Sequence, residues 1–174
     1  SAASDVYKRQ VQQVNGEFAE RFESRNLDLI CILQPEPLLI CADSRRIWRV
    51  LENLYVNVCK YAMPGTRVYV DAIKKDGKIQ FSIKNISENP LNFQADELTE
   101  RFIRGDVSRS TEGSGLGLSI AKNLTVLQHG SFNIYLDGDL FKVTITFDEA
   151  VKEKKPMPPM IVPEAVQEEA QQDA

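Results

Sequence analysis

Two asparagines and a lysine recur at helical spacing in residues 43–62, and their side chains suit a phosphate and its metal ion. With about 100° of rotation per residue and Asn53 taken as zero, Asn57 falls at about 40° and Lys60 at about −20°, so the three form one narrow polar stripe. A carboxamide oxygen is a hard, neutral ligand for Mg²⁺, and a lysine ammonium pairs with phosphate. Asparagine is also a mediocre helix former, because its amide competes for backbone hydrogen bonds. Two interpretations stay open here: a site for a metal-nucleotide, or the solvated edge of a helix.

A glycine-rich turn follows about 60 residues later, with glycines at Gly113, Gly115 and Gly117. Glycine lets the backbone take unusual dihedrals and approach a ligand closely. The first N–H groups of a helix lack internal partners, so a turn of this kind that opens a helix binds phosphate well. The spacing differs from the dinucleotide-binding fingerprint, and the lysine of a P-loop is absent. The turn therefore indicates either a phosphate cradle of another kind or simply a tight loop.

The elements that must position these residues follow from the apolar periodicity. Helical periods predict helices at 11–25, 43–62, 96–102 and 116–128, and alternation predicts strands at 29–33, 38–42, 67–74, 78–84, 132–136 and 141–147. Asp43 is an N-cap signal for the second helix, and a turn at Asp76-Gly77 joins two of the strands. The sum is an α+β fold, a two-layer α/β sandwich with a mostly antiparallel mixed sheet and the helices on one face.

Each long helix carries an apolar stripe that we expect to be buried. In the helix at 43–62 the stripe comprises Ile47, Val50, Leu51, Leu54, Val58 and Tyr61. In the helix at 116–128 it comprises Leu116, Ile120, Leu124 and Leu127.

Composition and charge narrow the classes of function. The 174 residues are 43% hydrophobic and carry a net charge of −4, so a nucleic-acid-binding surface is not indicated. No run of 18 apolar residues and no apolar signal sequence is present, so we expect a cytoplasmic chain without membrane contact. A cytoplasmic domain of this kind can also belong to a longer parent protein that is anchored in the plasma membrane. Three cysteines and a single histidine make a zinc site improbable, and we expect the cysteines to be small buried residues.

The chain divides into three parts. Residues 1–10 read as a non-native leader, 11–148 as one domain, and 149–174, rich in proline, charge and glutamine, as a disordered tail. Within the domain, the polar segment at about 93–115 is long enough to be a lid.

Taken together, these features resemble the histidine kinase branch of the GHKL ATPase superfamily. The segment Glu52-Asn-Leu-Tyr-Val-Asn-Val-Cys-Lys-Tyr-Ala62 is similar to that family's N box, and Glu100-Arg-Phe-Ile-Arg-Gly-Asp106, followed by Ser108-Arg109, is similar to its F box. Gly113 to Gly117 match the G2 box, and Leu127-Gln-His-Gly130 approximates the HGG ending of the next helix. The resemblance implies the Bergerat-type ATP-binding fold, with ATP and Mg²⁺ as cofactors.

The resemblance also implies roles for matching residues. Asn57 would coordinate Mg²⁺ and touch the phosphates, assisted by Asn53 and Lys60, while Tyr61 would lie near the base or sugar. The segment at 93–115 would be the ATP lid. In it, Phe102 would contact the nucleotide and Arg104 would stabilise the transferring phosphoryl group. The turn residues that would hold the phosphates are Gly113, Gly115, Leu116, Gly117 and Leu118.

Two departures from the family pattern qualify the resemblance. Asn85 stands where the G1 box has its adenine-reading aspartate, and the glycines of that box are missing from Ile86 to Asn92. An amide oxygen can still accept a hydrogen bond from the adenine amine. The second departure is that the chain has no phosphoacceptor helix. The only histidine, His129, occupies the position of the structural HGG histidine, so the substrate histidine would lie on dimerisation helices outside this chain, with a response regulator as the downstream partner.

Three alternatives remain. ATP-hydrolysing relatives of the gyrase, Hsp90 or MutL kind place a glutamate where Asn53 stands, and an amide cannot serve as a general base. An anti-sigma serine kinase normally has that glutamate too and lacks the Glu100 to Asp106 pattern. The altered G1 box favours a third alternative, a pseudokinase module that only binds partners.

Overall fold

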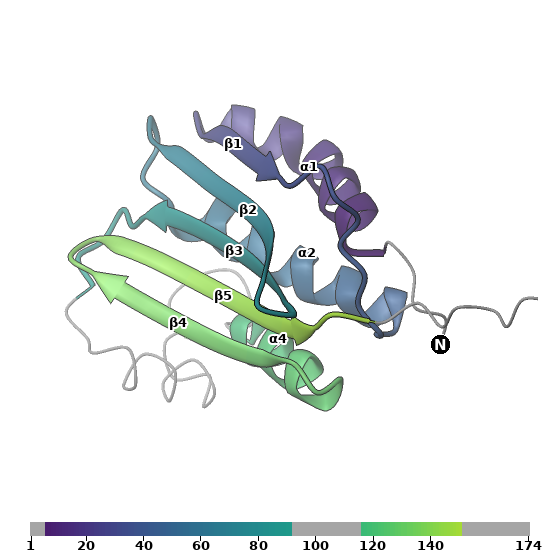
Figure 1. Ribbon diagram of the computed structural model, residues 1–174. Coiled ribbons are helices and arrows are strands. Elements are labelled where there is room, and N and C mark those ends of the chain that lie inside the picture. Colours follow the sequence, from purple (N-terminus) through teal and green to yellow (C-terminus); the bar gives the residue numbers. More distant parts are fainter. Residues whose placement is uncertain (1–5, 92–115, 151–174) are drawn as a thin grey trace, which may run out of the picture.

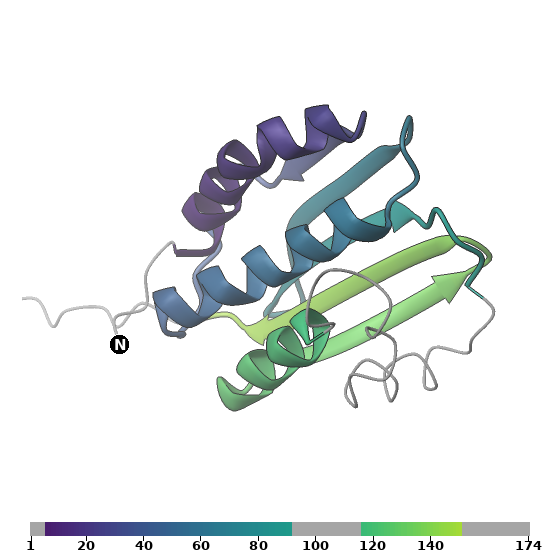
Figure 2. The ribbon, with the colours of Figure 1, turned by 180° about the vertical axis from the view of Figure 1, so that it is seen from behind.

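The computed structural model describes residues 6–91 and 116–150, which form a five-stranded sheet covered on one face by three helices (Figures 1 and 2). The elements in chain order are α1 (Val6–Ser24), β1 (Asp28–Leu33), α2 (Ser44–Tyr61), β2 (Arg67–Lys75), β3 (Lys78–Ile86), α4 (Gly117–Leu127), β4 (Ser131–Asp137) and β5 (Leu140–Asp148). Figure 2 shows α2 between α1 and α4, with all three on the same side of the sheet. The predicted two-layer α+β architecture is confirmed.

The sheet has the order β1-β2-β3-β5-β4, in which only β1 and β2 run parallel. The two predicted hairpins are present. Asp76 and Gly77 take φ values of 52° and 73°, as the tight turn between β2 and β3 requires, and Gly138 with φ 57° turns the chain between β4 and β5. The mixed, mostly antiparallel sheet is therefore as the alternation predicts.

Alternate residues of the central strands face the helices and form the core. The buried members on these strands are Val68, Val70, Ala72, Ile79, Phe81, Ile83, Phe141, Val143, Ile145 and Phe147. They pack in one cluster with the buried faces of the three helices. Because side chains alternate along a strand, the opposite face of the sheet carries the polar residues in between.

Helix α2 begins and ends where the sequence predicts. The carboxylate of Asp43 accepts hydrogen bonds from the N–H groups of Arg45 at 2.9 Å and Arg46 at 3.1 Å. These bonds, the one from Arg46 above all, lower the pKa of the Asp43 carboxyl. At the other end, the N–H of Ala62 donates to Val58 O at 2.9 Å, and the chain then turns at Gly65 with φ 81°.

The buried face of α2 differs from the predicted stripe at one aromatic. Tyr55, not Tyr61, is the large buried tyrosine, and its ring stacks on Phe22 of α1 with centroids 5.8 Å apart. Its hydroxyl donates to the side-chain oxygen of Asn15, and burial raises the pKa of the phenol. Tyr61 is only half-buried. This leaves Tyr61 at the border between the apolar face and the polar stripe.

Helix α4 buries a different face from the one predicted. Its buried residues are Leu118, Ser119, Ala121 and Thr125, whereas Leu116 and Leu127 of the predicted stripe are 42% and 59% exposed. The buried hydroxyl of Thr125 donates to Ala121 O at 2.7 Å, so burying it leaves no unpaired group. Small side chains on this face let α4 approach its neighbours closely.

The predicted strand at 38–42 is absent. Leu38, Ile40 and Ala42 are buried as an alternating strand would bury them, yet the segment makes only an isolated bridge between Ile40 and Glu149. The alternation therefore reflects a segment that crosses the core without joining the sheet.

The three cysteines also differ from expectation. Cys31 and Cys41 are exposed, and only Cys59 is partly buried. Burial raises the pKa of the Cys59 thiol to about 11, which disfavours the reactive thiolate.

Helix α1 begins at Val6, five residues before the predicted start at Val11. The other predicted segments lie wholly or mostly outside the described residues. They are the first part of the leader, the helix at 96–102, the lid and most of the tail. They stay predictions.

Replacement of Gly130 by alanine is expected to destabilise the fold. A Cβ at this position would lie 2.6 Å from the buried ring of Phe147 and 2.9 Å from Cγ2 of buried Thr125. Overpacking of this kind costs about 1–3 kcal/mol. Urea unfolding of Gly130→Ala measures it, with Gly16→Ala as the control, because a Cβ at Gly16 in α1 meets nothing within 4 Å. Alanine at that helical position should stabilise slightly. An unchanged midpoint for Gly130→Ala would contradict the close packing.

Candidate functional site

The polar stripe of α2 lines a small hollow together with the start of α4. The lining residues are Asn53, Val56, Asn57, Lys60, Tyr61, Gly117 and Leu118. The volume of the hollow is about 20 Å³, which is room for about one water molecule. The hollow therefore marks where the predicted side chains converge, and it does not have the volume of a whole ligand.

Gly117 lets the two helices approach at this point. A Cβ on Gly117 would lie 3.3 Å from Oδ1 of Asn53 and 3.8 Å from its backbone oxygen. The Nδ2 of Asn53 donates to Arg49 O at 2.7 Å, one turn back on α2, and this bond directs Oδ1 toward the start of α4. The first asparagine of the stripe thus faces the first residue of the helix that follows the glycine-rich turn.

The N-terminus of α4 has no side-chain cap. Leu116 occupies the N-cap position and makes no side-chain hydrogen bond there. The bond from Ile120 N to Leu116 O, at 2.8 Å, is the first bond of the helix that joins described residues. The N–H groups of Gly117, Leu118 and Ser119 precede it, at the positive end of the helix dipole. An anion is the natural partner for such an end.

Asn85 lies on the inner face of β3, in line with Ile83, and is only 2% exposed. Its Oδ1 has no hydrogen-bond partner among the described residues. A buried polar atom without a partner costs free energy, so its presence calls for a ligand or a functional reason. Two residues further on, Ser87 pairs with Ala62 at the end of α2. Asn85 thus lies near the C-terminal end of the stripe, although it does not line the hollow itself.

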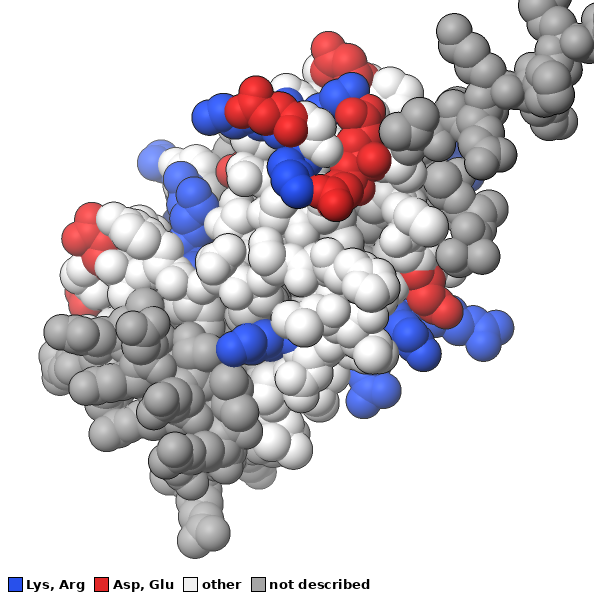
Figure 3. All heavy atoms as spheres, turned by 60° about the horizontal axis from the view of Figure 1, so that its bottom comes forward, with Lys and Arg blue, Asp and Glu red and all other residues white. Residues whose placement is uncertain are grey.

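Among the described residues that line the hollow, Lys60 is the one cation. Lys60 is exposed and forms no ion pair with any described residue. Figure 3 shows acidic and basic side chains in small mixed groups around a broad uncharged area on one face of the molecule. Of the described side chains that line the hollow, a phosphate would therefore meet a single cation, Lys60.

His129 lies at the opposite end of α4. It is exposed, takes a left-handed φ of 66°, and donates its N–H to Val126 O at 3.0 Å, which ends the helix. At 1.5 Å per residue, the helix places it more than about 15 Å from Gly117. This geometry gives His129 a role in the turn.

The predicted site residues fall into three groups. The first group lines the hollow and comprises Asn53, Asn57, Lys60, Tyr61, Gly117 and Leu118. The second group does not line it: Leu116 is the residue before Gly117, and Asn85 lies on β3. The other four predicted residues, Phe102, Arg104, Gly113 and Gly115, lie outside the described ranges.

Two larger hollows contain none of the predicted site residues. Their volumes are about 580 Å³ and 360 Å³, and both are lined by Asn26 and Asp28 at the end of α1 and the start of β1. Sequence reasoning also missed Arg25, which contacts the end of α2 from this region. No local signal marks it, because its partners are 34 and 37 residues away in the sequence.

The chain is similar to sensor kinases of several bacteria. It is 30% identical over 122 residues to the signal transduction histidine-protein kinase BaeS of Escherichia coli, covering 69% of this chain and 26% of that protein. It is 29% identical over 126 residues to the adaptive-response sensory kinase SasA of Synechococcus elongatus, covering 72% and 33%. The chain thus spans about a quarter to a third of the length of these relatives.

Solved structures share the fold. The catalytic domain of histidine kinase ThkA superposes with a TM-score of 0.71 at 22% identity, covering 82% of this chain and 91% of that one. Full-length ShkA in complex with AMPPNP superposes with a TM-score of 0.68 at 23% identity, covering 86% and 32%. Among the described residues, no helix is long and apolar enough to span a membrane.

A family model matches residues 42–151, well over half of the chain, and these residues include α2, α4 and the hollow between them. The chain therefore belongs to the family of histidine kinase-, DNA gyrase B- and HSP90-like ATPases.

Proposed function

We propose that this chain is the ATP-binding catalytic domain of a two-component sensor histidine kinase. It transfers the γ-phosphoryl group of ATP to a histidine on dimerisation helices outside the chain. The observation that carries the proposal is the convergence of Asn53, Asn57 and Lys60 on the uncapped N-terminus of α4. A side-chain cation and helix N–H groups together bind phosphates. The relatives, which are named as sensor kinases, support the choice of reaction.

The residues present fit a magnesium-nucleotide. Asn57 offers a neutral amide oxygen of the kind Mg²⁺ accepts, and its half-buried side chain is held on a rigid helix. The metal, when bound, neutralises charge on the phosphates. Lys60 binds a phosphate oxygen, the N–H groups from Gly117 onward hold the others, and Tyr61 packs near the base or sugar. Phe102 and Arg104 belong to the proposed lid, and Arg104 stabilises the transferring group.

Asn53 favours transfer over hydrolysis. Its Nδ2 is occupied by Arg49 O, and a carboxamide takes no proton from water at neutral pH. Hydrolysing relatives use a glutamate at this position, so the site lacks the general base that would activate water. The proposed partners are the phosphoacceptor helices of the parent protein and a response regulator. We place the domain in the cytoplasm.

A module that binds partners without catalysis is the second candidate, favoured by the altered segment after Asn85. There Glu88 N donates to Tyr61 O at 2.8 Å, so the segment is fastened to α2. Thermal unfolding with and without Mg²⁺-ATP separates the two candidates. A nucleotide at a hundred times its Kd stabilises the folded state by about 2.7 kcal/mol, which raises the melting temperature measurably. If millimolar Mg²⁺-ATP leaves the melting temperature unchanged, the kinase proposal is wrong.

The choice of base is expected to be less strict than at an aspartate site. An ionised aspartate only accepts hydrogen bonds and so favours the adenine amine, whereas the amide of Asn85 has an acceptor and a donor and can present either. We expect measurable GTP competition in the wild type and a sharper ATP preference in Asn85→Asp. Each tenfold change in preference corresponds to about 1.4 kcal/mol. Competition titrations of ATP against GTP measure it.

Asn85 is buried, so its variants need a control of the fold. Far-ultraviolet circular dichroism and the unfolding midpoint of Asn85→Asp and Asn85→Ala should show a folded chain. If both variants are folded and both leave the ATP and GTP affinities unchanged, Asn85 does not read the base.

A further inference from the structure

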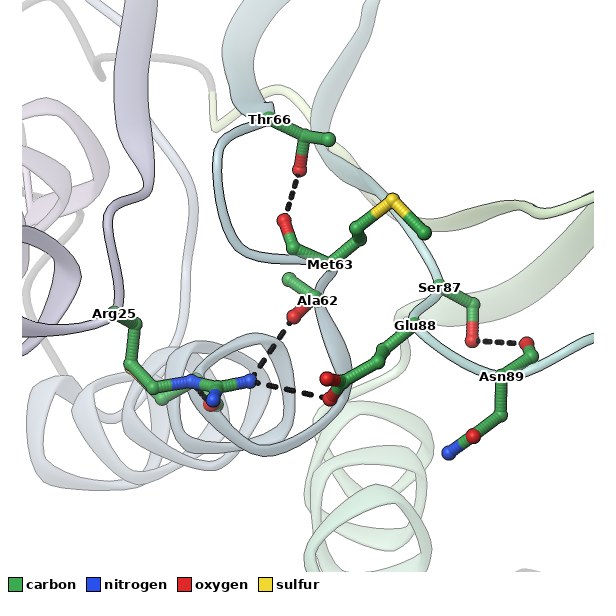
Figure 4. Close-up of polar contacts among 8 residues, drawn as sticks. Arg25, Ala62, Met63, Thr66, Ser87, Glu88 and Asn89 are labelled. Carbon is green, nitrogen blue, oxygen red and sulfur yellow. Dashed lines mark hydrogen bonds and ion pairs between the residues drawn. The ribbon is translucent and has the colours of Figure 1, made fainter.

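We propose that Arg25 is a positioning residue for the nucleotide: it fastens the C-terminal turn of α2, which carries Lys60 and Tyr61, to the end of α1 and to the segment after β3. The inference rests on the proposed function and adds a residue outside the family motifs. Arg25 lies just past the end of α1, and its side chain reaches across to the end of α2 (Figure 4).

The C-terminal carbonyls of α2 show why the end of this helix needs outside partners. The last four carbonyls of a helix have no partner within it. Here Cys59 O accepts from Nε of Arg25 at 2.9 Å, and Ala62 O accepts from its Nη2 at 3.1 Å. Tyr61 O accepts from the N–H of Glu88 at 2.8 Å. The turn that presents Lys60 and Tyr61 is therefore capped from α1 and from the segment after β3.

The same guanidinium also reaches the segment that follows Asn85. Its Nη2 lies 3.6 Å from Oε2 of Glu88, and the dashed line between these two side chains in Figure 4 marks the ion pair. The last residue of β3 is also joined to the residue after the C-cap of α2 by the bond from Met63 N to Ile86 O, at 2.8 Å. Three parts of the chain thus meet at one side chain: the end of α1, the end of α2 with Lys60 and Tyr61, and the segment that follows the strand of Asn85.

The contacts differ in expected strength. The Arg25 and Glu88 side chains are 34% and 47% exposed, so their ion pair is screened by solvent and contributes little. The two bonds to carbonyls are charge-assisted, and a cation at a helix C-terminus is also favoured by the dipole. Arginine suits this place because its planar fork has several donors in fixed directions, whereas a lysine ammonium cannot reproduce that geometry. The carbonyl bonds should therefore dominate.

The prediction separates the base side of the site from the phosphate side. The phosphates bind to Asn57, Lys60 and the start of α4, whereas Tyr61 and Asn85 serve the base. Of the phosphate-binding groups only Lys60 lies on the turn that Arg25 holds, and its flexible stem lets the ammonium still reach a phosphate when that turn shifts. Loosening the end of α2 should therefore weaken ATP more than tripolyphosphate, which has no base. We expect Arg25→Met to lower Mg²⁺-ATP affinity about tenfold, or about 1.4 kcal/mol, and to change Mg²⁺-tripolyphosphate affinity less than about twofold.

The experiment uses the 174-residue chain and four variants. Calorimetric titrations with both ligands compare wild type, Arg25→Met, Arg25→Lys, Glu88→Gln and the control Arg9→Met, which changes an exposed arginine on α1. Arg25→Lys should fall between wild type and Arg25→Met, and Glu88→Gln should lose about twofold or less. Arg9→Met should behave as wild type. An equal loss of both ligands in Arg25→Met, or no loss of either, overturns the proposal.

Amide hydrogen exchange supplies a second measurement without ligand. In Arg25→Met, the amides of Met63 and Glu88 should exchange at least about tenfold faster, while those within β3 and β5 keep their rates. Faster exchange throughout the chain would show general destabilisation and contradict a local role, as would unchanged rates at both amides. If the wild type binds no ATP, the proposed function is wrong. The exchange rates of the Met63 and Glu88 amides still show whether Arg25 holds the end of α2 against the segment after β3.

Discussion

The variant Asn57→Ala is expected to lose Mg²⁺-dependent ATP binding while it keeps its fold. Asn57 lines the hollow between α2 and α4, on the polar side of the helix, and is not part of the hydrophobic core. Its removal takes away the amide oxygen assigned to the metal without opening a cavity in the core. We expect the affinity for ATP in the presence of Mg²⁺ to fall at least about a hundredfold, or about 2.8 kcal/mol.

Calorimetry in Mg²⁺ and in a chelator measures this effect. The matched control is Asn133→Ala, an exposed asparagine on β4 away from the hollow, which should bind as wild type does. Unfolding midpoints of both variants should stay close to that of the wild type. If Asn57→Ala binds Mg²⁺-ATP with unchanged affinity, the metal assignment is wrong.

The stripe on α2 could be predicted from sequence because every signal for it is local. The N-cap at Asp43 fixes where the helix begins, and the spacing of Asn53, Asn57 and Lys60 then fixes the direction of their side chains. The hairpin turns follow from Asp76-Gly77 and Gly138 in the same way. Such features depend on a few neighbouring residues, and the structure confirms them.

The buried face of α4 could not be predicted, because two faces of this helix have the same period. Leu116, Ile120 and Leu124 form one stripe, and Leu118 with Ala121 forms the other. The structure buries the second fully, whereas Leu124 of the first is partly buried against the core and Leu116 is exposed. Which face is buried depends on how closely α4 packs against α2. That distance is set by the contact between Gly117 and Asn53, which are far apart in the sequence, so the sequence pattern does not reveal it. Ser119, Ala121 and Thr125 keep most of the buried face small, and larger side chains at these positions would hold the helices apart.

Tyr55 and Arg25 were missed for a related reason. The position of Tyr55 is set by Phe18 and Phe22 of α1, and its hydroxyl depends on Asn15. Arg25 gains its role only when the end of α1 meets the end of α2. Contacts between elements distant in sequence leave no periodic signal, so periodicity predicts the elements but not these junctions.

Incubated alone with labelled ATP, the chain is expected to acquire no acid-labile phosphate. Its only histidine, His129, lies at the far end of α4 from Gly117 and holds a left-handed turn. In-line transfer needs the acceptor within about 3–3.5 Å of the phosphorus, which this position does not offer. His129→Ala should therefore leave the result unchanged. Stoichiometric self-labelling that disappears in His129→Ala would overturn this view of the histidine.

The most direct test of the account is phosphoryl transfer in trans. The chain is mixed with the dimerisation and phosphoacceptor helices of its parent protein, Mg²⁺ and γ-labelled ATP, and acid-labile phosphate on the helices is followed over time. The account predicts label on the helices with the wild-type chain, none with Asn57→Ala, and undiminished label with His129→Ala. Absence of label with the wild-type chain, although it binds Mg²⁺-ATP and the helices, would contradict the assignment as a histidine kinase catalytic domain.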